Sequence, residues 1–260
     1  MTKKYQSITN KLAPVVAVAV IILIWFLCNN FEIVPAYMLP SPLDVARAFI
    51  DNFSVMLKQA AVTLQEAIYG LGIGIVLAFI VAALMDRFRF LRKAIYPILV
   101  ITQTIPTIAI APLLVLWMGF GMAPKITLVV ITTFFPISIG LLNGFENADR
   151  DEINMMRSMG AGRLQIFRHI KLPSAAGAFF SGLKISASYA IVGAVISEWL
   201  GGFEGLGVYM TRVKKAYAFD KMFAVIVFIS AVSLLLIAIV SVLQHIAMPW
   251  EQKKVKGKQI

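Results

Sequence analysis

The sequence has few charged residues and almost no cysteine or histidine. Of 260 residues, 14% are charged and 60% are hydrophobic, whereas a soluble domain has about 25% charged and about 45–50% apolar residues. The single cysteine, Cys28, excludes an intramolecular disulfide, and two widely separated histidines do not suggest a Cys/His metal site. The composition therefore predicts an integral membrane protein, and we expect no metal and no other cofactor.

Sequence motifs of common enzyme chemistry are also missing. The chain has no Gly-x-x-x-x-Gly-Lys-Ser/Thr phosphate loop, no Gly-x-Ser-x-Gly and no His-Glu-x-x-His. We therefore expect no catalytic residues in this chain.

Long apolar stretches are what the sequence has instead. A helix needs about 20 apolar residues to cross the hydrocarbon core of a membrane. Six stretches are long enough: Leu12–Phe31, Ala60–Met85, Ala94–Met118, Pro124–Phe145, Ala178–Ser197 and Met222–Met248. The first has a basic start like a signal peptide, but no small-residue cleavage site follows it, so we expect it to be retained.

The predicted fold is thus an all-α integral membrane protein with about six transmembrane helices. We divide the sequence into residues 1–59, with the first helix and an outer segment, and residues 60–260, a core with the other five. Within the core, Gly140 and Gly144 have the spacing of small residues at a contact between two helices.

The basic residues indicate the orientation in the membrane. One side carries sixteen of them: Lys3, Lys4, Lys11, Arg87, Arg89, Arg92, Lys93, Arg150, Arg157, Arg163, Arg168, Lys171, Lys253, Lys254, Lys256 and Lys258. The other side carries seven: Arg47, Lys58, Lys125, Arg212, Lys214, Lys215 and Lys221. The positive-inside rule then places both termini of this multi-pass protein in the cytoplasm. Because topology explains most of the net charge of +11, we expect no nucleic-acid partner.

The outer segment from Glu32 to Gln59 has the pattern of a surface helix. It contains Leu39-Pro40-Ser41-Pro42-Leu43-Asp44, where Ser41 or Asp44 can cap a helix. Apolar residues then recur at helical spacing. We expect an amphipathic helix lying on the outer face of the membrane.

The inner segment from Glu146 to Pro173 predicts two short helices with a glycine hinge. Two apolar periodic runs are separated by Gly160-Ala161-Gly162, and Pro173 is expected to end the second helix where the next span begins. Half of this cytoplasmic loop is apolar, so it needs a protein partner.

The same loop carries a motif. The loop resembles the cytoplasmic signature found in the membrane subunits of bacterial ATP-binding-cassette (ABC) importers. Gly160, Ile170, Leu172 and Pro173 match that signature in spacing. Asn154-Met155-Met156 stands where that signature has Glu-Ala-Ala, and Glu152 lies two residues earlier.

Further stretches are similar to the nitrate, sulfonate, taurine and pyrimidine-precursor branch of these permeases. They are Leu39-Pro40-Ser41-Pro42, Ile105-Pro106-Thr107-Ile108-Ala109-Ile110-Ala111-Pro112-Leu113, Gly119-Phe120-Gly121, Phe134-Phe135-Pro136-Ile137 and Gly205-Leu206-Gly207.

The resemblance implies a fold like that of type I ABC importer permeases and a coupling helix within 146–173 that docks on a cytoplasmic ATPase. The coupling residues would be Glu152, Asn154, Met155, Met156, Gly160, Ala161, Ile170, Leu172 and Pro173. It also implies a cytoplasmic ATP-binding subunit, an extracytoplasmic substrate-binding protein and a second permease copy as partners. The implied solute is a pyrimidine or thiamine precursor, with sulfonate, taurine or nitrate next.

Polar residues within the spans are candidates for the solute pathway. These are Thr102, Gln103, Thr104 and Pro106 in the third span, and Glu198 at the outer end of the fifth. The alternatives are hydrogen bonds between packed helices for the third span, a structural role for Pro106, and a membrane-interface position for Glu198. Glu66 is either a pathway group or a residue at the wetted boundary of the membrane, and we favour the boundary position.

Two other classes of function compete with the importer. An ion-coupled carrier predicts a functional acid or base deep in a span and usually an internal repeat. A membrane enzyme predicts a paired nucleophile and base, or clustered acids. The long apolar and basic inner loop favours the importer.

Overall fold

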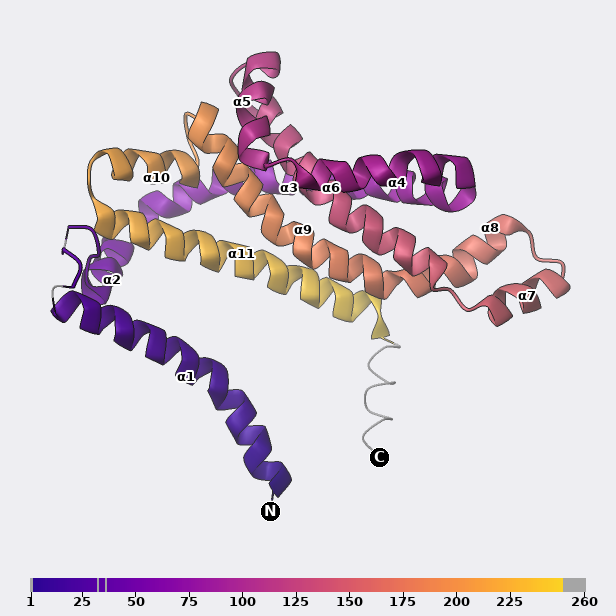
Figure 1. Ribbon diagram of the computed structural model, residues 1–260, viewed down its shortest axis with the longest axis horizontal. Coiled ribbons are helices and arrows are strands. Elements are labelled where there is room, and N and C mark those ends of the chain that lie inside the picture. Colours follow the sequence, from indigo (N-terminus) through magenta and orange to yellow (C-terminus); the bar gives the residue numbers. More distant parts are fainter. Residues whose placement is uncertain (1, 32, 36, 250–260) are drawn as a thin grey trace. The chain divides into compact units, whose positions relative to one another are not determined.

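The computed structural model describes residues 2–31, 33–35 and 37–249. Within them, all the regular elements are helices (Figure 1), as the sequence predicts. In chain order they are α1 (Thr2–Asn30), α2 (Pro42–Asp51), α3 (Phe53–Arg87), α4 (Arg89–Thr104), α5 (Thr107–Met118), α6 (Met122–Glu146), α7 (Arg150–Ser158), α8 (Arg163–Ile166), η1 (Phe167–Lys171), α9 (Leu172–Gly201), α10 (Leu206–Lys215) and α11 (Phe219–Ala247). Four of the predicted inner basic residues lie outside the described residues: Lys253, Lys254, Lys256 and Lys258.

Within the described residues, the predicted spans correspond to five long apolar helices and one broken pair. The long helices are Ala13–Asn30, Phe53–Arg87, Met122–Glu146, Arg163–Gly201 and Phe219–Ala247, and the pair is α4 with α5. We expected one span over Ala94–Met118, but the chain bends by 101° between α4 and α5. Because a residue before proline disfavours the helical conformation, Ile105 is extended (φ −82°, ψ 121°) next to Pro106.

The chain divides into two compact units. The first consists of Met1–Leu57 and Tyr209–Phe228, and the second of Lys58–Val208 and Ile229–Ile260. The sequence division at residues 59 and 60 stays a prediction.

In the first unit, α2 confirms the helix predicted after Ser41, and its position on the outer face of the membrane stays a prediction. Ser41 is its N-cap, and the Ser41 hydroxyl accepts a hydrogen bond of 3.1 Å from the backbone N–H of Asp44. Val45 and Ala48 face the core of this unit.

In the second unit, α6 and α9 pack closely side by side. A Cβ atom at Gly140 would lie 2.6 Å from the Ala178 carbonyl oxygen, and one at Gly182 would lie 2.5 Å from the Pro136 carbonyl oxygen. Such distances are shorter than real contacts, so the helix backbones approach as closely as they do only because these residues are glycines.

Candidate functional site

The inner loop is built as a helix, a fixed hinge and a second helix. Asp149 caps α7, its carboxylate accepting a 2.8 Å hydrogen bond from the N–H of Asp151. At the other end Gly160 has a φ of +82°. There the N–H groups of Gly160 and Ala161 donate to the carbonyls of Arg157 and Met156, at 3.0 and 2.9 Å. This pair of bonds is the Schellman arrangement, so the predicted glycine hinge is confirmed as a defined turn.

The second helix of the loop does not end at Pro173, and that prediction is wrong. Helix α8 continues through the π-helical turn η1 into α9 without a break. The Leu172 N–H donates to the Phe167 carbonyl five residues back. This wider turn accommodates the Pro173 ring, which in a regular α-helix would clash with the carbonyl four residues earlier. The loop is therefore joined rigidly to the span α9.

The predicted coupling residues divide into an exposed set and a packed set. Helix α7 buries none of its side chains completely, and Met155 is 60% exposed. Beside it, Met159 and Leu164 are 79% and 77% exposed. In contrast, Ile170 is 6% exposed and packs within the second unit. Glu152, Asn154, Gly160 and Pro173 are exposed, whereas Met156, Ala161 and Leu172 are half-buried.

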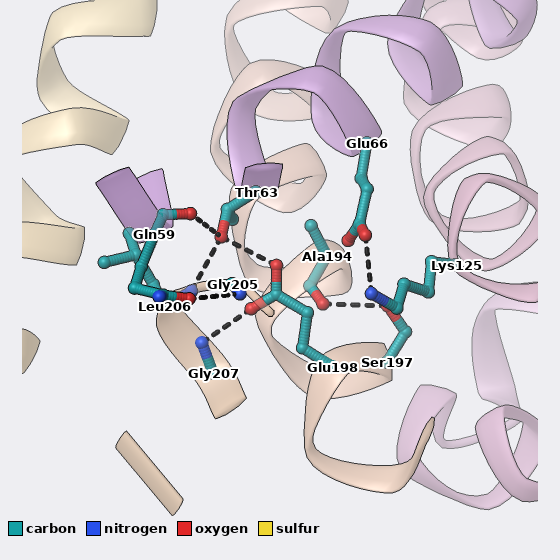
Figure 2. Close-up of polar contacts among 10 residues, drawn as sticks. All are labelled: Gln59, Thr63, Glu66, Lys125, Ala194, Ser197, Glu198, Gly205, Leu206 and Gly207. Carbon is teal, nitrogen blue, oxygen red and sulfur yellow. Dashed lines mark hydrogen bonds and ion pairs between the residues drawn. The ribbon is translucent and has the colours of Figure 1, made fainter. Parts of the chain in front are cut away.

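A second candidate site is a buried cluster of polar side chains from α3, α6 and α9 (Figure 2). In it, the Lys125 amine lies 2.6 Å from Oε1 of Glu66, and the two side chains are 7% and 0% exposed. Oε2 of Glu66 has no hydrogen-bond partner among the described residues. The interpretation of Glu66 as a wetted boundary residue is therefore wrong, and Lys125 is not a free outer charge.

Glu198 holds the start of α10 to α3 and α9. Its Oε1 accepts a 2.6 Å bond from the Thr63 hydroxyl, and its Oε2 accepts a 2.6 Å bond from the N–H of Gly207. The Thr63 oxygen in turn accepts a bond from the Leu206 N–H at 2.9 Å. Gly205 has a φ of +123°, and a Cβ atom there would overlap the carboxyl group of Glu198.

These contacts account for the Gly205-Leu206-Gly207 motif. Each of its three N–H groups is used, because the Gly205 N–H donates to Oε1 of Gln59 at 2.6 Å. Glu198 is 1% exposed, so its interpretation as an interfacial acid is wrong. Its role in the solute pathway stays a prediction.

The pathway candidates of the third span are only partly brought together. Thr102 and Gln103 line a cavity of about 150 Å³ with Thr132 and Tyr189. Thr104 and Pro106 are exposed and do not line it. The Thr102 hydroxyl donates to the Leu99 carbonyl of its own helix at 2.7 Å. For all four residues, the pathway role stays a prediction.

The side chains in the described part of the chain contain no group of three or more His, Cys, Asp or Glu residues that could hold a metal ion. The first candidate site has exposed apolar side chains, and the second contains a buried ion pair.

Comparisons with known proteins agree with these features. Residues 70–250, more than half of the chain, match the family described as "Binding-protein-dependent transport system inner membrane component". The formylaminopyrimidine transport permease protein of Halalkalibacterium halodurans is 33% identical over 98% of this chain and 100% of its own length. A probable ABC transporter permease protein of Haemophilus influenzae is 36% identical over 90% of this chain and 96% of its own.

More distant relatives, at 25% or 26% identity, are permeases named for aliphatic sulfonates, taurine and nitrate. Among solved structures, an inward-facing methionine ABC transporter matches with a TM-score of 0.58 and 18% identity, over 73% of this chain and 93% of that one. This likeness supports the fold alone.

Proposed function

The chain belongs to the family of inner-membrane components of binding-protein-dependent transport systems, and we propose that it carries a pyrimidine-type thiamine precursor or a similar small organic solute into the cytoplasm. Membership makes the chain a permease subunit of an ABC importer for a small solute, in which ATP is hydrolysed by a separate subunit. It also overturns the ion-coupled carrier and the membrane enzyme as alternatives.

The observation that carries the mechanism is the exposed apolar face of the inner loop. Met155, Met159 and Leu164 stand out from a loop whose hinge is fixed by two backbone hydrogen bonds. Exposed apolar side chains of this kind mark a site of protein contact. We infer that this face docks on the ATPase and that α8, η1 and α9 transmit its movement to the spans.

The proposed orientation follows from this docking. The loop 146–173 faces the cytoplasm, as do both termini, and the binding protein delivers solute at the opposite end. Six spans enclose too little space for a solute path, so a second copy of the permease completes it. Thr102, Gln103 and Glu198 are the residues we assign to that path, with Thr104 and Pro106 beside the break in the third span.

Two glycines of the hinge provide a matched pair for testing the loop. Gly160 has a φ of +82°, where a β-branched residue is strained, whereas Gly162 has a φ of −71°, which any residue adopts. The full chain would be reconstituted in liposomes with its ATPase and binding proteins, and ATP hydrolysis and solute uptake would be measured.

We expect Gly160→Val to insert normally but to lose most of the ATPase stimulation and uptake, and Gly162→Val to keep both. Equal activity of the two variants would contradict a coupling role for this hinge.

The substrate requires a separate measurement. The support for a pyrimidine-type solute is that the relative matching over 98% of the chain is named for formylaminopyrimidine. Sulfonates, taurine and nitrate are the next candidates. Uptake of the labelled pyrimidine, competed by each of the others, should show that the pyrimidine alone is transported at micromolar concentration. Uptake of taurine or a sulfonate in its place would contradict this assignment without affecting the permease class.

A further inference from the structure

A basic cavity lies beside the inner loop. It has a volume of about 700 Å³ and is lined on one side by Asp86, Arg87 and Arg89, and on the other by Arg157, Arg163 and Lys171. Asp86 is already paired with Lys171, whose amine lies 2.6 and 2.9 Å from the two carboxylate oxygens. The four arginines form no ion pair with any acid in the described part of the chain. The cavity therefore presents four uncompensated positive charges to whatever enters it.

An apolar groove lies between α3 and α9, the helices that also contribute to this cavity or adjoin it. Its volume is about 410 Å³, and its walls include Val76, Phe79 and Ile80 from α3 and Ala175, Ala176 and Phe179 from α9. Val76 and Ile80 are 58% and 49% exposed.

The cavity and the groove lie end to end along the same two helices. On α3, Val76, Ile80, Ala83 and Arg87 recur every three or four residues, so they share one face of the helix. Along η1 and α9, the same spacing joins Phe167, Lys171, Ala175 and Phe179. A ligand that fills both must have an anionic head and an apolar tail.

We propose that the cavity and groove together bind an anionic phospholipid. Its phosphate lies among Arg87, Arg89, Arg157 and Arg163, which suit phosphate because guanidinium groups donate two parallel hydrogen bonds. Its acyl chain lies along the groove between α3 and α9. Basic pockets between transmembrane helices at the membrane surface bind such headgroups. An acidic segment of a soluble protein would satisfy the arginines but leave the groove empty, so the groove favours a lipid.

This proposal rests on the membrane location of the chain and not on its proposed solute or coupling role. The test uses the purified full chain in an uncharged detergent, with lipid binding measured by native mass spectrometry. The probes are phosphatidylglycerol, phosphatidylcholine with the same acyl chains, glycerol phosphate and inorganic phosphate. The variants are Arg87→Gln with Arg163→Gln in the cavity, Ala176→Phe in the groove, and Lys214→Gln with Lys215→Gln as a charge-matched control in α10.

We expect phosphatidylglycerol to bind at least about tenfold more tightly than phosphatidylcholine. Each basic side chain near an anionic lipid contributes about fivefold in affinity, so the double arginine variant should lose about 25-fold. Ala176→Phe should weaken phosphatidylglycerol but not glycerol phosphate, and the α10 control should change neither. The double arginine variant should unfold at the temperature of the parent chain in detergent, because Arg87 and Arg163 are exposed side chains.

Three results would overturn the proposal. Equal affinity for phosphatidylglycerol and phosphatidylcholine would show that the arginines do not select an anionic headgroup. Binding of glycerol phosphate or inorganic phosphate as tightly as phosphatidylglycerol makes this a site for small anions. Unchanged lipid affinity in the arginine variant, with loss of assembly with the ATPase, assigns the cavity to a protein interface.

Discussion

Removing the Lys125 amine tests the buried ion pair directly. In Lys125→Met, the Glu66 carboxylate keeps its place in the second unit but loses its ion pair with Lys125, and its Oε2 atom already has no hydrogen-bond partner among the described residues. Breaking a buried pair by removing one partner costs about 3–5 kcal/mol. Glu66→Leu, which leaves the ammonium group buried, should cost a similar amount.

The double variant separates the ion pair from simple loss of packing. Replacing both charges by apolar side chains of similar volume is often neutral or stabilising. We therefore expect Glu66→Leu with Lys125→Met to unfold within about 1 kcal/mol of the parent, far less than the sum of the single costs. Unfolding of the full chain in detergent would be followed by denaturant titration. Lys58→Met, an exposed lysine, is the control and should change stability by less than about 0.5 kcal/mol.

Additive costs in the double variant would refute the reasoning, because two independent residues show no coupling. Single variants that lose less than about 1 kcal/mol of unfolding free energy would also refute it, because a buried charge without its partner destabilises a protein by more than that.

Two further predictions concern backbone positions that only glycine can fill. Gly205→Ala places a Cβ atom in the carboxyl group of Glu198 and at a φ of +123°, so it should lower the unfolding temperature clearly and expose the start of α10 to proteolysis. Gly182→Ala places a Cβ atom 2.5 Å from the Pro136 carbonyl oxygen, whereas Gly72→Ala meets nothing within 4 Å. The first should cost about 1–3 kcal/mol by overpacking and the second should be neutral or slightly stabilising, both measured by thermal unfolding in detergent.

Local signals in the sequence were sufficient for much of the fold. Long apolar stretches located the spans, because the length of a spanning helix is set by the thickness of the membrane. Ser41 and Gly160 marked a helix start and a helix end, since capping depends on the few residues around each terminus. Both residues act in the structure as predicted.

Features that depend on distant residues were not predictable in this way. Glu66 and Lys125 are 59 positions apart, and each by itself has the pattern of a charge at the edge of the membrane. Only the packing of α3 against α6 brings them together. The continuous helix through Pro173 was missed for a local reason: the π-helical turn that accommodates this proline leaves no pattern in the residues.

The contacts of Glu198 limit what this residue does in transport. Both of its oxygens accept hydrogen bonds from the chain itself, and the donors come from α3 and from the start of α10. A solute therefore reaches this carboxylate only after the Gly207 N–H or the Thr63 hydroxyl has left it, which also frees the turn at Gly205. Because the bonds are buried, their loss is costly unless new partners replace them. A pathway role for Glu198 thus requires either the Thr63 side chain of α3 or the backbone of residues 205–207 to move away from this carboxylate.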